Sequence, residues 1–276
     1  MTNEDHCDLY RSDRILAVAL ADGLGSSADS SVAAKLAVKT FLHQVEQVDA
    51  ELREVSIADL HSFWNRTSQK ITNHFQTNFA KYAGLAHPLE TTLITVVDQG
   101  DSYLISYLGN GSIWYVRGDF WEFLDRRWPW SISDLLISQS VLDDDGRDAL
   151  YGLIGHTGLH GEIRTLIVNK DHHRGEILIV TTDGISSPDH LKVGHDPNNK
   201  LWLEVNPYIE RLLRDHLRRY LTSNSPSVTC RNGCLQKVLD DFLTVETFDD
   251  DASLGIIVSD SVFTYPNRNH LAAHSK

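Results

Sequence analysis

An unbroken apolar run, Ile15–Ala21, ends abruptly at Asp22 and Gly23. Seven apolar residues are the length of a β-strand that is covered on both faces. A carboxylate at the end of such a strand is held rigidly, and the glycine beside it lets a ligand or another backbone come close. Asp-Gly alone is also a common turn signal, so this one pattern fits an ordinary turn equally well.

The pattern returns at two distant places in the chain. Glu176–Val180 is another strand-like run that leads to Asp183, and three aspartates, Asp249–Asp251, precede the run Ala252–Val258. Acidic groups at strand ends are costly to bring together unless cations neutralise them. Oxygen ligands of this kind suit hard divalent ions such as Mg²⁺ or Mn²⁺. The repetition therefore indicates a site for divalent cations.

Composition narrows the class of protein. The chain has 276 residues and a formal net charge of -13. We expect one domain over residues 1–276, because no Pro-, Gly- or Ser-rich linker or internal repeat divides it. The negative charge argues against a nucleic-acid or anionic-membrane surface, and no apolar run is long enough for a membrane span. Three cysteines form no disulfide framework and the first residues form no secretory signal, so a cytoplasmic location is expected.

The periodicity of apolar residues predicts a mixed fold. Long amphipathic stretches predict two helices early in the chain, and β-branched and aromatic runs predict strands after residue 90. A mostly helical insertion is expected at about 186–245, and residues 131–155 are expected to be helical and then irregular. Short hairpin links favour antiparallel pairing. The expected helices span 30–48 and 57–82, and the expected strands span 91–97, 102–108, 113–117, 163–168 and 177–180.

Three further features have both a structural and a functional interpretation. Phe120–Trp130 is unusually aromatic and is expected to cover a sheet edge, with docking of a partner as the alternative. The arginines of Tyr208–Leu221 are expected to form a solvated face rather than a phosphate site. Cys230 and Cys234 do not complete a zinc site by themselves.

Six short motifs are spread over nearly the whole chain: Asn3-Glu4-Asp5, Ala21-Asp22-Gly23-Leu24-Gly25, Thr91-Thr92, Leu108-Gly109-Asn110-Gly111, Thr182-Asp183-Gly184 and Asp250-Asp251-Ala252-Ser253. In this order they resemble the metal-dependent type-2C protein phosphatase family, and Leu24 after Asp-Gly resembles its bacterial members. The resemblance implies an α+β fold, a four-layer αββα sandwich of two antiparallel sheets flanked by helices.

The resemblance also implies a site with two Mg²⁺ or Mn²⁺ ions. Asp22 would bridge both ions and the carbonyl of Gly23 would bind one of them. Asp183 and Asp250 would each hold an ion directly, and Glu4 and Asp5 would contribute partly through water. Asp22 and Asp183 would act in catalysis through a metal-activated water that hydrolyses a phosphomonoester, with no protein nucleophile.

The chain departs from the family pattern where phosphate and a third ion would bind. The family's arginine before the first acidic pair has no counterpart, and the candidates to replace it are Arg11, Arg14, Arg117, Arg126 and Arg127. A third ion would have the neutral Asn110 as a ligand instead of the usual acid. Ser187 stands where another acid is common, with Asp189 slightly displaced from that position.

Three functional hypotheses follow. The first is a Mg²⁺/Mn²⁺-dependent phosphatase acting on phosphoserine and phosphothreonine in proteins, as the counterpart of a Ser/Thr kinase. The second is a catalytically weak or inactive phosphatase-like binding or regulatory module. The third is a phosphotransferase with an aspartate nucleophile at Asp22 on a parallel sheet, which the antiparallel order of strands argues against.

Overall fold

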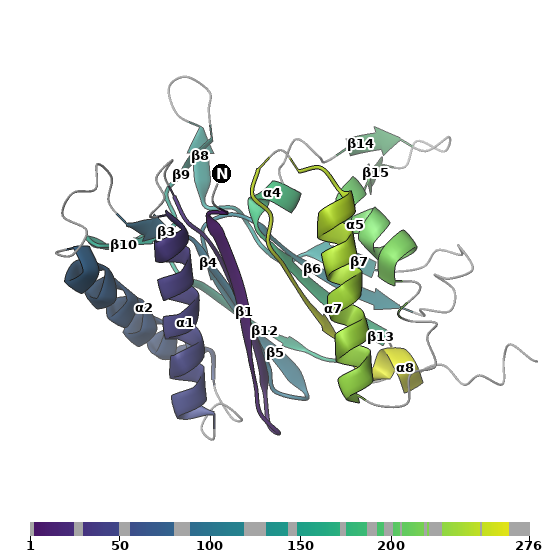
Figure 1. Cartoon of the computed structure of the whole chain (residues 1–276), viewed down its shortest axis with the longest axis horizontal. Coiled ribbons are helices and arrows are strands. Elements are labelled where there is room, and N and C mark those ends of the chain that lie inside the picture. The colour runs from purple at the N-terminus through teal and green to yellow at the C-terminus, as the bar shows by residue number, and fades with distance from the viewer. Residues whose placement is uncertain are drawn as a thin grey trace, which may run out of the picture.

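The architecture of the chain was analysed in a computed structural model of residues 1–276. Two β-sheets lie face to face, with helices on both outer sides (Figure 1). The structure describes the following residues: 3–24, 30–49, 56–79, 89–118, 131–142, 148–171, 175–186, 192–195, 201–204, 206–217, 220, 228–248 and 250–264. None of the helices within these ranges combines the length and apolar content needed to cross a bilayer.

The first sheet has five antiparallel strands in the order β1-β2-β4-β5-β12. The interior strand β2 alternates small alanines on one face with Val18 and Leu20 on the other, so each face packs against a different layer. The strands are β1 (Asp5–Arg11), β2 (Leu16–Asp22), β4 (Leu93–Asp98), β5 (Ser102–Leu108) and β12 (Arg164–Asn169).

The second sheet has four antiparallel strands in the order β16-β13-β6-β7. Its strand β13 is buried along its whole length, as expected for a central strand. The edge strand β16 lies so close to the first sheet that a methyl group on Gly255 would be 2.6 Å from Cγ1 of Val18. The strands are β6 (Ser112–Gly118), β7 (Ser131–Asp134), β13 (Gly175–Thr181) and β16 (Leu254–Val258).

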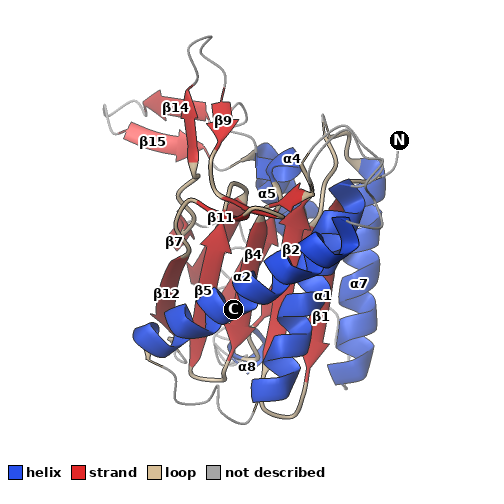
Figure 2. Ribbon diagram, turned by 90° about the vertical axis from the view of Figure 1, so that its left-hand side faces the viewer, coloured by secondary structure: helices blue, strands red, loops and turns tan. Residues whose placement is uncertain are grey.

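Three hydrophobic cores separate four layers. The first core lies between the first sheet and helices α1 (Ser30–Val48) and α2 (Ile57–Phe79), of which α2 crosses the strands obliquely in Figure 2. The second lies between the two sheets. The third lies between the second sheet and a helical layer made of α5 (Pro207–Arg211), the π-helical turn η3 (Leu212–Leu217) and α7 (Val228–Val245). The predicted α+β fold with helices outside two antiparallel sheets is confirmed.

Short elements complete the fold at its ends. A three-stranded sheet joins β3 to the β10–β11 hairpin, and two further hairpins stand apart from the main sheets. These elements are β3 (Glu90–Thr91), β8 (Ser140–Leu142), β9 (Asp148–Leu150), β10 (Leu153–Gly155), β11 (Gly158–His160), β14 (Lys192–His195), β15 (Leu201–Glu204), α4 (Asp183–Ser186) and α8 (Ser261–Thr264).

The expectation for residues 131–155 was wrong. The segment forms short strands, of which β7 pairs with β6 and β10 pairs with β3 and β11, whereas β8 and β9 pair with each other. The carboxylate of Asp134 accepts hydrogen bonds from the N–H groups of Ile113 and Leu136, at 3.0 and 3.1 Å. The buried Gln139 side chain donates to the Glu162 carbonyl at 2.6 Å. Tertiary contacts of this kind leave no periodic signal in a strand of three or four residues.

The longer predicted elements are confirmed within the described residues. The helix expected at 30–48 has those bounds, and the one expected at 57–82 is described over 57–79. The five expected strands match β4, β5, β6, β12 and β13 to within a few residues. Helix α7 begins at Val228, and a hairpin precedes the helices between residues 186 and 245. Phe120–Trp130 lies outside the described residues, and the single-domain organisation stays a prediction.

Candidate functional site

Aspartates from four strand ends meet at one end of the sandwich. Asp5 begins β1 and pairs in register with Asp22, the last residue of β2. Asp183 follows β13, and β16 runs antiparallel to it with Leu254 opposite Thr181. Because Asp250 comes shortly before β16, it lies at the same end as Asp183. The sheet topology thus brings together residues separated by more than 200 positions.

Two threonines fix the backbone at Asp22. The Thr91 hydroxyl donates to the Asp22 carbonyl at 2.8 Å, and the Thr92 N–H donates to the same oxygen at 2.9 Å. The Asp22 N–H in turn donates to the Thr92 hydroxyl oxygen at 2.9 Å. Both polar groups of the Asp22 peptide unit are therefore satisfied, and its carboxylate is held at a fixed position.

Thr182 connects three of the strand ends. Its hydroxyl donates to Oδ2 of Asp5 at 2.6 Å and accepts from the Ser253 N–H at 2.9 Å. Its backbone N–H also donates to the Ser253 carbonyl at 3.1 Å. Thr182 is 2% exposed, so these groups have no access to water as an alternative partner. One side chain therefore ties the ends of β1 and β13 to the segment before β16.

The remaining acids are oriented by polar contacts across the same end. The amide of Asn110, in the turn between β5 and β6, donates to Oδ2 of Asp183 at 2.6 Å. The carboxylate of Asp251 accepts from the Glu4 N–H at 2.6 Å. Asp250 accepts from the following N–H, that of Asp251, at 2.8 Å.

Two glycines allow the backbone segments at this end to touch. A methyl group on Gly23 would overlap the carbonyl oxygen of Ser30, and one on Gly184 would overlap that of Asp251. The Gly23 N–H donates to the Glu4 carbonyl at 3.2 Å. A larger residue at either position would push the acidic segments apart.

Burial and mutual repulsion disfavour the charged form of these acids. Burial, with additional repulsion from Asp5 and Asp183, raises the pKa of Asp22 to about 9. Burial also raises the pKa of Asp5 to about 7, although its hydrogen bond from Thr182 acts in the opposite direction. Burial, followed by the charge of Asp250, raises the pKa of Asp183. None of the described lysine or arginine side chains forms an ion pair with these three carboxylates.

The donor set fits a hard divalent cation by its chemistry. It consists of carboxylate and carbonyl oxygens that are buried, repel one another and have no described cationic side chain beside them. Within the described ranges, no three His, Cys, Asp or Glu side chains are grouped as ligands of a single ion. Positive charge at this end would offset the burial and the repulsion that together raise the pKa values of Asp5, Asp22 and Asp183.

The structure brings most of the predicted site residues together. Glu4, Asp5, Asp22, Gly23, Asn110, Asp183 and Asp250 all lie at this end of the sandwich, whereas Asp189 lies outside the described residues. The sequence motifs contain Thr91, Thr92 and Thr182 but give no role for them. Their function in fixing the acids depends on pairing between distant strands, which the sequence does not display.

Three of the arginines proposed as replacements for the missing phosphate ligand are wrong candidates. Arg11 is the last residue of β1 and Arg14 lies in the turn that follows, so both are at the end opposite to Asp5. Six residue steps of an antiparallel strand span about 20 Å, which is too far for a shared phosphate. Arg117 is at the distant end of β6 and lies over the ring of Tyr115, 5.0 Å from its centroid. Arg126 and Arg127 lie outside the described residues.

Comparisons with known proteins identify the fold. Residues 1–127 match the family model described as Protein phosphatase 2C. No sequence among curated proteins matches the chain. The resemblance to type-2C phosphatases seen in the sequence motifs is thereby confirmed.

Several solved bacterial phosphatases share the fold over nearly the whole chain. The serine/threonine phosphatase of S. agalactiae superposes with a TM-score of 0.58 at 14% identity, covering 94% of both chains. Stp1 from Staphylococcus aureus gives 0.56 at 15% identity, covering 94% of this chain and 89% of that one. The catalytic domain of PstP, solved in complex with two manganese ions, gives 0.53 at 18% identity, covering 94% and 93%. At such identities the likeness shows the fold alone.

We expect Thr182→Val to destabilise the protein by about 1–3 kcal/mol, because the change leaves the Asp5 carboxylate and the Ser253 N–H buried without their partner. Urea unfolding followed by circular dichroism measures the free energy. Thr182→Ser keeps the hydroxyl and serves as the control, with a loss well below that of Thr182→Val. Equal stability of the valine variant and the wild type would contradict the role assigned to this hydroxyl.

The raised pKa of Asp22 predicts a pH-dependent stability in chelator-treated protein. Its folded-state pKa of about 9 lies above the ordinary value of 3.8, so the folded state binds the extra proton. The contribution is fully present below pH 4 and is lost as pH rises toward 9. Asp22→Asn removes this titration, so the stability of the variant relative to wild type should increase between pH 5 and 9. A constant difference across that range in urea unfolding would refute the assignment.

Proposed function

We propose that this chain is a metal-dependent protein serine/threonine phosphatase that hydrolyses phosphoserine and phosphothreonine. The convergence of the largely buried Asp5, Asp22 and Asp183 with the exposed Asp250 carries the proposal, because bound cations offset both the burial and the mutual repulsion of such carboxylates. The match of residues 1–127 to the protein phosphatase 2C family and the fold shared with bacterial serine/threonine phosphatases support it.

The ligands of two Mg²⁺ or Mn²⁺ ions are proposed from the same residues. They are the carboxylates of Asp22, Asp183 and Asp250 and the carbonyl of Gly23, with Glu4 and Asp5 contributing at the N-terminal side. Such a pair of ions supplies a water of lowered pKa and neutralises phosphate charge during in-line displacement. PstP, which shares the fold, was solved with two manganese ions.

In the proposed reaction the protein holds the acids in place and leaves the attack to water. Thr182 orients Asp5, Thr91 and Thr92 fix Asp22, and Asn110 orients Asp183. A thiol nucleophile is not supported, because burial raises the pKa of Cys7 to about 12 and its Sγ contacts the Leu254 carbonyl instead. Hydrolysis by water also agrees with the antiparallel order of strands around Asp22.

The proposed substrate is a protein that a Ser/Thr kinase has phosphorylated.

The proposed metal site holds two ions, without a third. The amide of Asn110, the neutral residue considered for a third ion, is directed at Asp183. Asp189, the other candidate, lies outside the described residues.

A second candidate function is a phosphatase-like binding module with little turnover. The positions of Arg11, Arg14 and Arg117 favour it, because they leave these arginines at the wrong end for phosphate capture. The two candidate functions differ in whether a phosphoester is hydrolysed at the acidic end, and an assay of phosphate release separates them.

We expect Mn²⁺-dependent release of phosphate from p-nitrophenyl phosphate and from a phosphothreonine peptide. Asp22→Ala and Asp183→Ala should each lower kcat/KM by about 100-fold or more, because several kcal/mol of charge stabilisation are lost. Asp8→Ala, which removes an exposed acid on the same strand as Asp5, is the matched control and should retain activity.

Turnover that persists in both site variants would eliminate the proposed mechanism. Absence of turnover in wild-type protein that binds phosphopeptide by calorimetry would instead establish the binding module. A chelator should abolish the activity of the wild type and leave its circular dichroism spectrum unchanged.

A further inference from the structure

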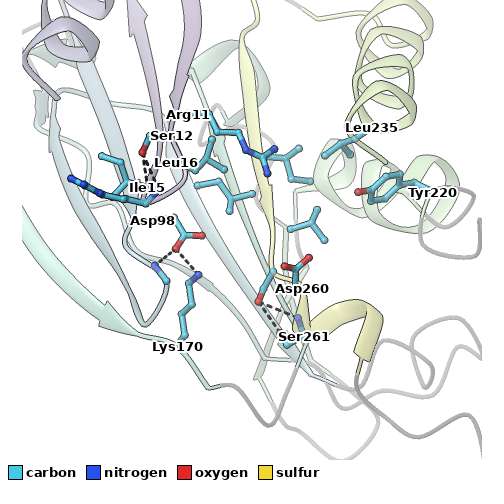
Figure 3. Close-up of a pocket in the computed structure, with 16 residues that line it drawn as sticks. Arg11, Ser12, Ile15, Leu16, Asp98, Lys170, Tyr220, Leu235, Asp260 and Ser261 are labelled. Carbon is cyan, nitrogen blue, oxygen red and sulfur yellow. Dashed lines mark hydrogen bonds and ion pairs between the residues drawn. The ribbon is translucent and has the colours of Figure 1, made fainter. Parts of the chain in front are cut away.

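A cavity lies at the end of the sandwich opposite to the acidic cluster (Figure 3). Its volume is about 460 Å³, within the roughly 300–1,000 Å³ typical of small-molecule sites. The walls come from the β1–β2 turn, the β4–β5 turn with Lys170 beside it, the end of β16 with Asp260 after it, helix α7 and Tyr220. Every residue that lines it belongs to the described part of the chain.

The guanidinium of Arg11 extends into this cavity from the end of β1 (Figure 3). No described residue forms a hydrogen bond or ion pair with it. A second cation in the lining, Lys170, is already neutralised. Its Nζ lies 2.5 Å from Oδ1 of Asp98 and 4.6 Å from the centroid of the Tyr103 ring. Arg11 therefore remains available to bind an anion.

The cavity also has an aliphatic side. Leu16 and Leu235 face the Arg11 side chain in Figure 3, and Ile256 and Val258 belong to the same lining. A free inorganic anion would use only the arginine and would leave this apolar surface in contact with water. A ligand with a charged head and an aliphatic body would use both.

We propose that this cavity binds a small organic anion with an aliphatic body, the simplest example being a medium-chain carboxylate. Its carboxylate pairs with the Arg11 guanidinium, and its chain packs on the leucines of β2 and α7. Arg14 is also among the lining residues and adds positive charge there, although the net charge of the protein is -13.

The cavity is separate from the acidic cluster and does not depend on its function. β1 and β2 connect the two, with Asp5 and Asp22 at one end and Arg11 and Leu16 at the other. The separation of about 20 Å along these strands prevents a small ligand from touching both sites. Binding in the cavity should therefore be unaffected by changes at the acidic cluster.

Octanoate is the probe, because it carries the charge and the chain and contains no phosphoester that the acidic cluster could cleave. Calorimetry and ligand-observed NMR on the full chain should show octanoate binding at least about tenfold tighter than acetate or octan-1-ol. Arg11→Gln should weaken octanoate binding about tenfold or more, since a charged hydrogen bond is lost. Leu235→Glu should abolish it by placing a negative charge in the aliphatic wall.

Two variants serve as matched controls. Arg66→Gln removes an exposed arginine on α2 and should leave the dissociation constant unchanged, as should Asp22→Ala. The proposal is overturned if octanoate does not bind at millimolar concentration, if octan-1-ol binds as tightly, or if Arg11→Gln binds as well as wild type. Loss of octanoate binding in Asp22→Ala would also overturn it, by placing the ligand at the acidic cluster. None of these octanoate-binding results bears on the proposed phosphatase function, which the phosphate-release assay tests separately.

Discussion

Repulsion among buried carboxylates is the constraint that the acidic end of this fold must accommodate. Asp5, Asp22 and Asp183 each have a raised pKa because burial and neighbouring acids disfavour their charged forms. Left to local forces, such side chains would turn outward into water. They stay because neutral donors hold them: Thr182 holds Asp5 and Asn110 holds Asp183, each through a hydrogen bond of 2.6 Å. The three hydrophobic cores supply the rigidity that keeps these donors in position.

The face-to-face arrangement of the sheets explains why distant segments of sequence share one site. β1 and β2 form a hairpin whose open end carries Asp5 and Asp22, and β13 and β16 present Asp183 and Asp250 at the same end. Close contact between the sheets at their edges requires small residues. Gly255 accommodates Val18 within the core, and Gly184 accommodates the Asp251 carbonyl beside the site. The site is therefore a consequence of strand register, and a shift of one residue would point its acids to the opposite faces.

Sequence reasoning succeeded where a signal is local and repeated. α1 and α2 are long and periodic, and the runs that end at Asp22 and Asp183 mark buried strands, so the elements and the clustering of acids could be predicted. It failed at residues 131–155, because strands of three or four residues are stabilised by partners such as Ile113 and Glu162 that lie outside the segment. It also failed for Arg11. Arg11 was a candidate for the missing phosphate ligand, but the extended strand β1 carries it six residues beyond Asp5 to the far end of the sheet.

The placement of the arginines has a consequence for how a phosphate could be held. A dianionic phosphate approaching Asp5, Asp22 and Asp183 meets carboxylates with which no described lysine or arginine forms an ion pair. In the proposed mechanism the divalent cations therefore perform two tasks, activation of water and attraction of the substrate. Cation binding and phosphate binding become thermodynamically coupled, since each reduces the electrostatic cost of the other. An arginine near Asp5 would separate these tasks. With Arg11 at the opposite end of β1, substrate affinity in the proposed mechanism would depend on ion occupancy, and the Arg11 side chain would serve a different anion.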